Sequence, residues 1–210
     1  MSTRATYSFE NERTGVTNTV YIHHDGYPKG AAQYMYDAIK QGSADFFFAF
    51  IRANERAEAT ESHDAHSDTE WRYVFYHQGT QVQVQSKSWN DDGEPEWNEY
   101  ANCSIAEFIE RELGIVLLNY KRGLHTAEEI MQSITDDLTS ALRMAATGAI
   151  GNASSAAGEI WRAIAAFEEL IDAALLDQAR NVCRGIADLI VAKSPQWNDV
   201  DLYISRVWAR

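Results

Sequence analysis

Residues 71–85 read WRYVFYHQGTQVQVQ, and this stretch decides the fold of the first half of the chain. Trp71, Tyr73 and Phe75 alternate with their neighbours, and Val82 and Val84 alternate with glutamines beyond a Gln-Gly pair. Alternation with a period of two is typical of a half-buried strand, and a glycine between two such runs permits a tight turn. The stretch therefore predicts a β-hairpin with strands over residues 71–77 and 80–89.

A second hairpin is predicted at the N-terminus, where Ala5, Tyr7 and Phe9 alternate with polar residues and a polar turn precedes another apolar run. The sequence Asp-Gly-Tyr-Pro at residues 25–28 ends that run, because glycine tolerates positive φ and proline lacks an N–H. Helical spacing follows over 31–39 and 46–51. We expect an α+β fold with helices on one face of a four-stranded, mainly antiparallel sheet. Its strands are residues 4–10, 17–24, 71–77 and 80–89.

Polar segments separate these elements. Residues 54–69 contain almost no large apolar side chain and predict a solvated loop or a frayed helix end. Residues 90–99 predict an acidic loop, and Ser104 with Glu107 has the spacing of a capping box, which predicts a short helix to about residue 113.

The pattern becomes helical after residue 123. Thr126 and Glu129 form another capping-box motif, followed by a stripe through Ile130, Ile134, Leu138 and Leu142. Two further stripes cover 160–174 and 182–190, and the small, Gly-rich stretch 147–158 is either a turn between helices or a place of close helix approach. We expect a sheet domain over 1–123 and an Ala-rich helical bundle or hairpin over 124–210. Stripes rich in Ala and Ile over residues 130–190 also predict a homodimer through these C-terminal helices.

The charge balance is acidic, with 18 Lys and Arg against 31 Asp and Glu and a formal net charge of −13. Such a chain has no general attraction to phosphate backbones or anionic lipid, so we expect neither direct nucleic-acid binding nor membrane binding. The first ten residues lack the apolar core of a signal peptide, and two distant cysteines are typical of a reducing compartment. We expect a cytoplasmic protein.

One candidate for chemistry is the turn that contains His23, Asp25 and Tyr27. On a strand that reaches Asp25, the side chains of His23 and Asp25 share one face and could act as an oriented base or as two metal ligands. The alternative is structural: Asp25 and Gly26 make the turn, and His23 bonds to nearby backbone.

Other reactive residues have simpler explanations. His63 and His66 could share a metal on a helix, but the polar stretch around them favours incidental surface histidines. Cys103 and Cys183 are expected to be packed thiols, because nothing in the sequence supplies a base beside either one. The sequence contains no HExxH, P-loop, GxSxG or paired CxxC motif. We therefore predict no catalytic residue, no metal and no cofactor.

The charge pattern offers a candidate binding surface. No Lys or Arg lies between Lys87 and Arg111, and a second acidic stretch covers residues 55–70. An acidic surface of this kind docks on a basic one, although solvated loops kept soluble by their charge are the alternative. The candidate partner-binding residues are Asp91, Asp92, Glu94, Glu96, Glu99, Glu107 and Glu110.

The N-terminal segment resembles a family of uncharacterised proteins common in phages and other mobile elements. The resemblance is carried by Ser2-Thr3-Arg4-Ala5-Thr6 and by the stretch VYIHHDGYP at residues 20–28, and it covers about the first 115 residues. It implies a phage or prophage setting and action in the host cytoplasm, where small acidic proteins often antagonise host defence. It carries no established activity.

Three functions are compatible with these observations. The first is a non-enzymatic inhibitor of a host defence system such as CRISPR–Cas, which covers a basic protein or ribonucleoprotein surface with its acidic loops and mimics nucleic acid. The second is a small metal-dependent hydrolase or nucleotide-processing enzyme that uses His23 and Asp25. The third is an oligomeric scaffold assembled through the C-terminal helices.

Overall fold

The structure is a computed structural model of the 210-residue chain. It describes residues 3–12, 14–42, 45–120, 123–194, 196–197 and 199–209. The chain forms two compact units, Met1–Leu124 and His125–Arg210.

The first unit contains a six-stranded mixed sheet in the order β3-β2-β1-β4-β5-β6. Its strands are β1 (Ala5–Asn11), β2 (Val16–Ile22), β3 (Glu58–Thr60), β4 (Trp71–Tyr76), β5 (Gln81–Trp89) and β6 (Pro95–Ser104). Both expected hairpins are present, β1 with β2 and β4 with β5. A short two-stranded ribbon, β7 (Leu118–Tyr120) with β8 (Gly123–His125), follows the sheet.

The α+β class is confirmed, but the expected four-stranded antiparallel sheet is wrong. β1 pairs with β4 in parallel, because the chain crosses through two helices between the hairpins and returns in the same direction. β3 and β6 extend the sheet on both sides. The stretch expected to be an acidic loop over 90–99 is a five-residue turn followed by β6, and its polar residues lack alternation because much of that strand is exposed.

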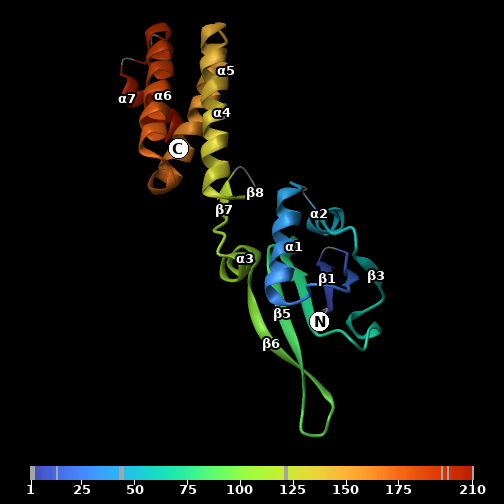
Figure 1. The fold of residues 1–210 in the computed structure, drawn as a ribbon. Coiled ribbons are helices and arrows are strands. Elements are labelled where there is room, and N and C mark those ends of the chain that lie inside the picture. The colour runs from blue at the N-terminus through green and yellow to red at the C-terminus, as the bar shows by residue number, and fades with distance from the viewer. Residues whose placement is uncertain are drawn as a thin grey trace. The chain divides into compact units, whose positions relative to one another are not determined.

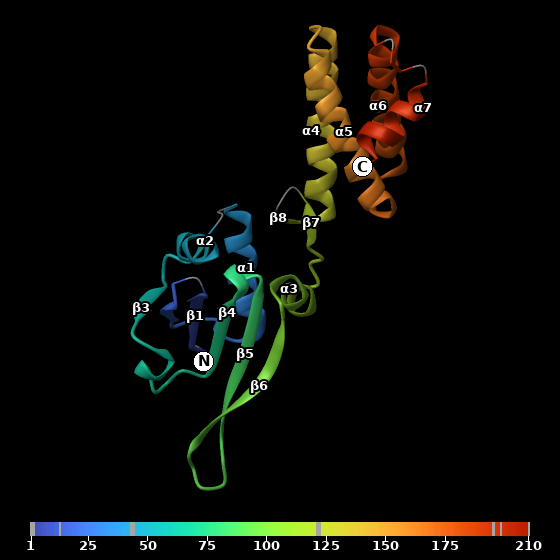
Figure 2. The ribbon, with the colours of Figure 1, turned by 180° about the vertical axis from the view of Figure 1, so that it is seen from behind.

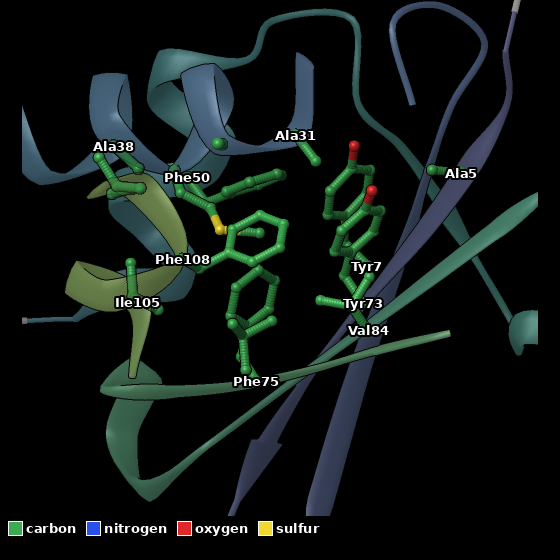
Figure 3. Packing of buried hydrophobic residues seen from close by; sticks show 14 of the residues in the cluster. Ala5, Tyr7, Ala31, Ala38, Phe50, Tyr73, Phe75, Val84, Ile105 and Phe108 are labelled. Atoms are coloured by element: carbon green, nitrogen blue, oxygen red, sulfur yellow. The ribbon is translucent and has the colours of Figure 1, made fainter. Parts of the chain in front are cut away.

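Three helices pack on one face of this sheet: α1 (Pro28–Lys40), α2 (Phe46–Ala53) and α3 (Ile105–Leu113). Tyr7 and Tyr73 stack there with ring centroids 4.9 Å apart, and Phe9 stacks on Phe75. Figure 3 shows the two tyrosine rings side by side with their hydroxyls at the same end. Each buried aromatic side chain contributes about 1.5–3 kcal/mol, so this face fixes the sheet and its register.

The second unit is a helical bundle. Its helices are α4 (Ala127–Ala146), α5 (Ile150–Phe167), α6 (Ala173–Lys193) and α7 (Val200–Tyr203). The capping box at Thr126 and Glu129 begins α4. Both alternatives for 147–158 occur: residues 147–149 connect α4 to α5, and Gly158 allows close approach, since a Cβ there would lie 2.9 Å from the Cδ1 of Trp208.

Two details of the helical stripes differ from the sequence prediction. The stripe over 160–174 is not one helix, because α5 ends at Phe167 and the carboxylate of Asp172 accepts hydrogen bonds from the N–H groups that begin α6. Ala141 is buried in α4, whereas Leu142 is 48% exposed.

Candidate partner-binding surface

The hairpin of β5 and β6 extends beyond the rest of the sheet. The last residue of β5 paired with β4 is Ser86, opposite Trp71, whereas the pairing with β6 continues from Lys87 to Trp89. We call residues 87–97 the arm. Figure 1 shows it as a long hairpin that leaves the body of the sheet, and Figure 2 shows the same from behind.

The tip of the arm is an ordered turn. The side-chain oxygen of Asn90 accepts hydrogen bonds from the backbone N–H of Asp92 at 3.1 Å and of Glu94 at 2.8 Å. Gly93 has a φ of 77°, a conformation that favours glycine. Asp91, Asp92 and Glu94 are exposed on this turn, and they have no ion-pair partner in the described part of the chain. The turn therefore presents three carboxylates on an ordered backbone, without ion-pair partners among the described residues.

The other predicted acids lie on different surfaces. Glu96 is exposed on the arm, while Glu99 lies within the sheet and accepts a hydrogen bond from Gln83 at 2.9 Å. Glu107 caps α3, and hydrogen bonds from the backbone and hydroxyl of Ser104 lower its pKa. Glu110 is exposed on the same helix. The seven acids are thus divided among the arm, the body of the sheet and α3.

Aromatic side chains line one face of the arm. The guanidinium of Arg72 lies 3.8 Å from the ring centroid of Trp97, and the ammonium of Lys87 lies 5.0 Å from that of Trp89. Trp89 is 65% exposed. The sequence analysis did not select either tryptophan. The pattern that could have identified them is a pair of tryptophans on both sides of an acidic turn, because tryptophan is common at binding hot spots.

A groove lies at the root of the arm. It has a volume of about 420 Å³. Its lining residues come from the segment before β4 and from β5: Ser67, Asp68, Thr69, Glu70, Trp71, Ser86, Lys87 and Trp89. The groove lies beside the first residue of β4, beyond which the arm continues without that strand as a neighbour.

Part of the second acidic stretch contacts the sheet, although its acidic side chains remain exposed. Asp68 pairs with Arg4 at 3.1 Å and accepts a hydrogen bond from the hydroxyl of Tyr21, and Asp64 pairs with Arg72. The Nδ1 of His63 lies 2.6 Å from the hydroxyl of Thr6. The expectation of a solvated loop or frayed helix end over 54–69 holds only in part: most of the segment is exposed, but it includes β3 and is tied to the sheet by these contacts.

The two histidines of this segment are held apart from each other. His66 stacks on Tyr21 with ring centroids 3.8 Å apart, whereas His63 contacts Thr6. Burial, with the nearby charge of Arg72, lowers the pKa of His63 from 6.5 to about 4. No group of three or more potential metal ligands occurs among the described residues.

The turn after β2 is a structural junction. β2 ends at Ile22 and Asp25 has a φ of 52°, so the alternation expected to place Asp25 beside His23 does not continue. Two hydroxyls hold this turn from the core side: Tyr34 donates to the carbonyl of His24 and Tyr73 to that of Gly26. Tyr27 is the N-cap of α1 without a side-chain cap bond.

His23 faces a different set of residues. Its Nε2 lies 3.5 Å from a carboxylate oxygen of Glu58, and both residues line a shallow pocket of about 260 Å³ with His24, Glu55 and Arg56.

The two cysteines are separate from these sites. Cys183 is buried and Cys103 half-buried, and burial raises the pKa of the Cys183 thiol to about 12. Neither thiol is activated.

Comparison of the chain with protein-family models, curated proteins and solved structures finds no match. In the described ranges, no helix combines the length and the apolar character required to cross a membrane.

Proposed function

We propose that the protein is a non-catalytic binding protein that docks its arm on a basic surface of a partner protein or ribonucleoprotein. The observation that carries the proposal is the arm tip, where three exposed and unneutralised carboxylates extend beyond the sheet on an ordered turn. The whole chain is also negative, with a formal net charge of −13, so it adds to the attraction toward a basic partner. Exposed charges of this kind act mainly by steering encounter over a screening length of about 8 Å at physiological salt.

We further propose that the setting is a phage infection and that the partner belongs to a host defence system, such as a CRISPR–Cas complex. The support is the resemblance of residues 2–6 and 20–28 to the phage and mobile-element family. In this proposal the carboxylates of the arm occupy a site that otherwise attracts nucleic-acid phosphates, and the protein acts in the host cytoplasm.

The hydrolase alternative lacks a supporting geometry. A base or a metal pair at the turn needs His23 and Asp25 on one face, and the backbone departs from a strand between them. The hydroxyls of Tyr34 and Tyr73 donate hydrogen bonds to backbone carbonyls of this turn, which stabilises its conformation.

The test is capture of partners from host lysate with two variants that reverse the same number of charges. The arm variant carries Asp91→Lys, Asp92→Lys and Glu94→Lys. The control carries Glu169→Lys, Asp177→Lys and Asp188→Lys, three exposed acids of the helical unit. We expect the wild type and the control to capture the same basic partner, and the arm variant to lose it while remaining folded.

Protection of phage in defence-positive cells gives the functional readout of the same variants. Equal capture and equal protection by the arm variant and the wild type would contradict the proposal.

A further inference from the structure

The groove at the root of the arm exposes an unpaired strand edge. The N–H of Lys87 donates to the carbonyl of Glu70 at 2.9 Å, so this residue faces the side where β4 lies. Backbone groups alternate sides along a strand, and those of Trp89 therefore face the same side as those of Lys87. β4 begins only at Trp71, opposite Ser86, and among the described residues no strand pairs with this edge of β5 beyond Ser86.

The wall opposite this edge holds polar groups without partners. Thr69 is 1% exposed and lines the groove, and its hydroxyl has no hydrogen-bond partner in the described part of the chain. A buried hydroxyl without a partner is unfavourable, so a polar group that reached it from the groove would stabilise the complex. The exposed carboxylate of Glu70 lines the same wall and has no ion-pair partner among the described residues.

The aromatic wall favours cations. Lys87 is held across the groove by its hydrogen bond to the carbonyl of Ser67 at 2.8 Å and by its position near the ring of Trp89. Trp89 remains 65% exposed, so an arginine or lysine from a partner can approach its ring and face Glu70. The negatively charged carboxylates of the arm tip also attract cationic side chains of the partner.

We propose that the groove binds an extended, basic peptide segment of the partner, which adds as a short strand to the free edge of β5. The inference deepens the proposed function and rests on it: the arm tip steers the partner, and the groove recognises one of its extended segments. At about 3.3 Å per residue, the free edge accommodates only a few residues of the segment. Specificity then comes from a cationic side chain placed between Trp89 and Glu70.

Labelled peptides test this inference directly with the full chain. The probe is a blocked hexapeptide of alternating arginine and valine. Its counterparts replace arginine by glutamate, or carry N-methyl groups at alternate residues to remove the edge hydrogen bonds. Affinity is measured by fluorescence anisotropy, and the bound site is mapped by amide chemical shifts in NMR spectra.

We expect the basic probe to shift the amides of Glu70, Ser88 and Trp89 and the indole signal of Trp89. Trp89→Ala should weaken binding about thirtyfold and Glu70→Gln about two- to fivefold. The control variants Phe48→Ala and Glu10→Gln, exposed residues outside the groove, should bind as the wild type does. The glutamate probe should not bind, and N-methylation should weaken binding about tenfold.

Two results would contradict peptide binding in the groove while leaving the proposed function intact. One is binding of the basic probe with shifts confined to residues 90–94 and no loss in Trp89→Ala, which assigns recognition to the tip charges alone. The other is no binding of the basic probe up to about 1 mM. Lysate capture with the arm variant decides the proposed function separately.

Discussion

The guanidinium of Arg72 on β4 stacks on the ring of Trp97 on β6 at 3.8 Å from its centroid, and the same guanidinium pairs with Asp64. Arg72 thereby joins the root of the arm to the segment that covers the open sheet face. Its side chain is 15% exposed, so the interaction is screened less than an ordinary surface pair.

Replacing Arg72 should remove its stacking on Trp97 and its ion pair with Asp64 together. We expect Arg72→Ala to lower the free energy of unfolding by about 1–3 kcal/mol, and Arg72→Lys to restore only part of it, because a lysine cannot stack its planar group. Urea denaturation measures the change, with Arg206→Ala as an exposed control. If Arg72→Ala unfolds with the same free energy as the wild type, the stacking of Arg72 on Trp97 does not contribute to stability.

The stacked tyrosines give a matched pair of substitutions. The hydroxyl of Tyr73 donates to the carbonyl of Gly26 at 2.9 Å, whereas that of Tyr7 is buried without a partner in the described structure. We expect Tyr73→Phe to destabilise the protein by about 1–2 kcal/mol and Tyr7→Phe to be neutral or stabilising. Thermal or urea unfolding distinguishes the two variants, and equal destabilisation by both would contradict this account of the turn.

The lowered pKa of His63 predicts a pH dependence of stability. Burial and the charge of Arg72 lower the pKa of His63 to about 4 in the folded protein, against 6.5 ordinarily. Between these values the unfolded chain binds more protons at this residue, so the stabilising contribution is complete above pH 6.5 and falls as the pH drops toward 4. Urea unfolding at pH 7 and near pH 4.5 should show a loss of about 1–3 kcal/mol in wild type that is smaller in His63→Gln. Identical losses would exclude His63 as the cause.

The helical unit carries the prediction of a homodimer. Leu142 and Leu189 lie on α4 and α6 and are 48% and 44% exposed. We expect a second copy to cover such residues, so light scattering should give a dimer mass for the wild type and a monomer mass for Leu142→Glu combined with Leu189→Glu. A monomeric wild type at micromolar concentration would contradict the prediction.

The sequence predicted local structure better than tertiary structure. Alternation around Tyr7 and Tyr73 located both hairpins, and the spacing of Ser104 and Glu107 located the start of α3, because these signals depend on neighbours in the chain. The parallel pairing of β1 with β4 depends on the crossover through α1 and α2, which no local pattern encodes. β6 was missed since an exposed arm has no single buried face to produce alternation.

The candidate site was predictable only in part. The charge pattern pointed to the acids of the arm tip, but it could not separate them from Asp64 and Asp68, whose ion pairs with Arg72 and Arg4 depend on the tertiary structure. The groove joins Thr69 to Trp89 across the end of β4, and their proximity follows from the sheet register rather than from spacing.

The most direct test of the account is the association rate with the partner captured from lysate, measured on an immobilised partner across a series of salt concentrations. We expect the rate for the wild type and for the Glu169, Asp177 and Asp188 control to fall steeply with salt, and the rate for the Asp91, Asp92 and Glu94 lysine variant to be at least about tenfold lower at low salt and nearly independent of salt. An arm variant that associates as fast as the wild type, with the same salt dependence, would contradict the claim that the arm steers binding.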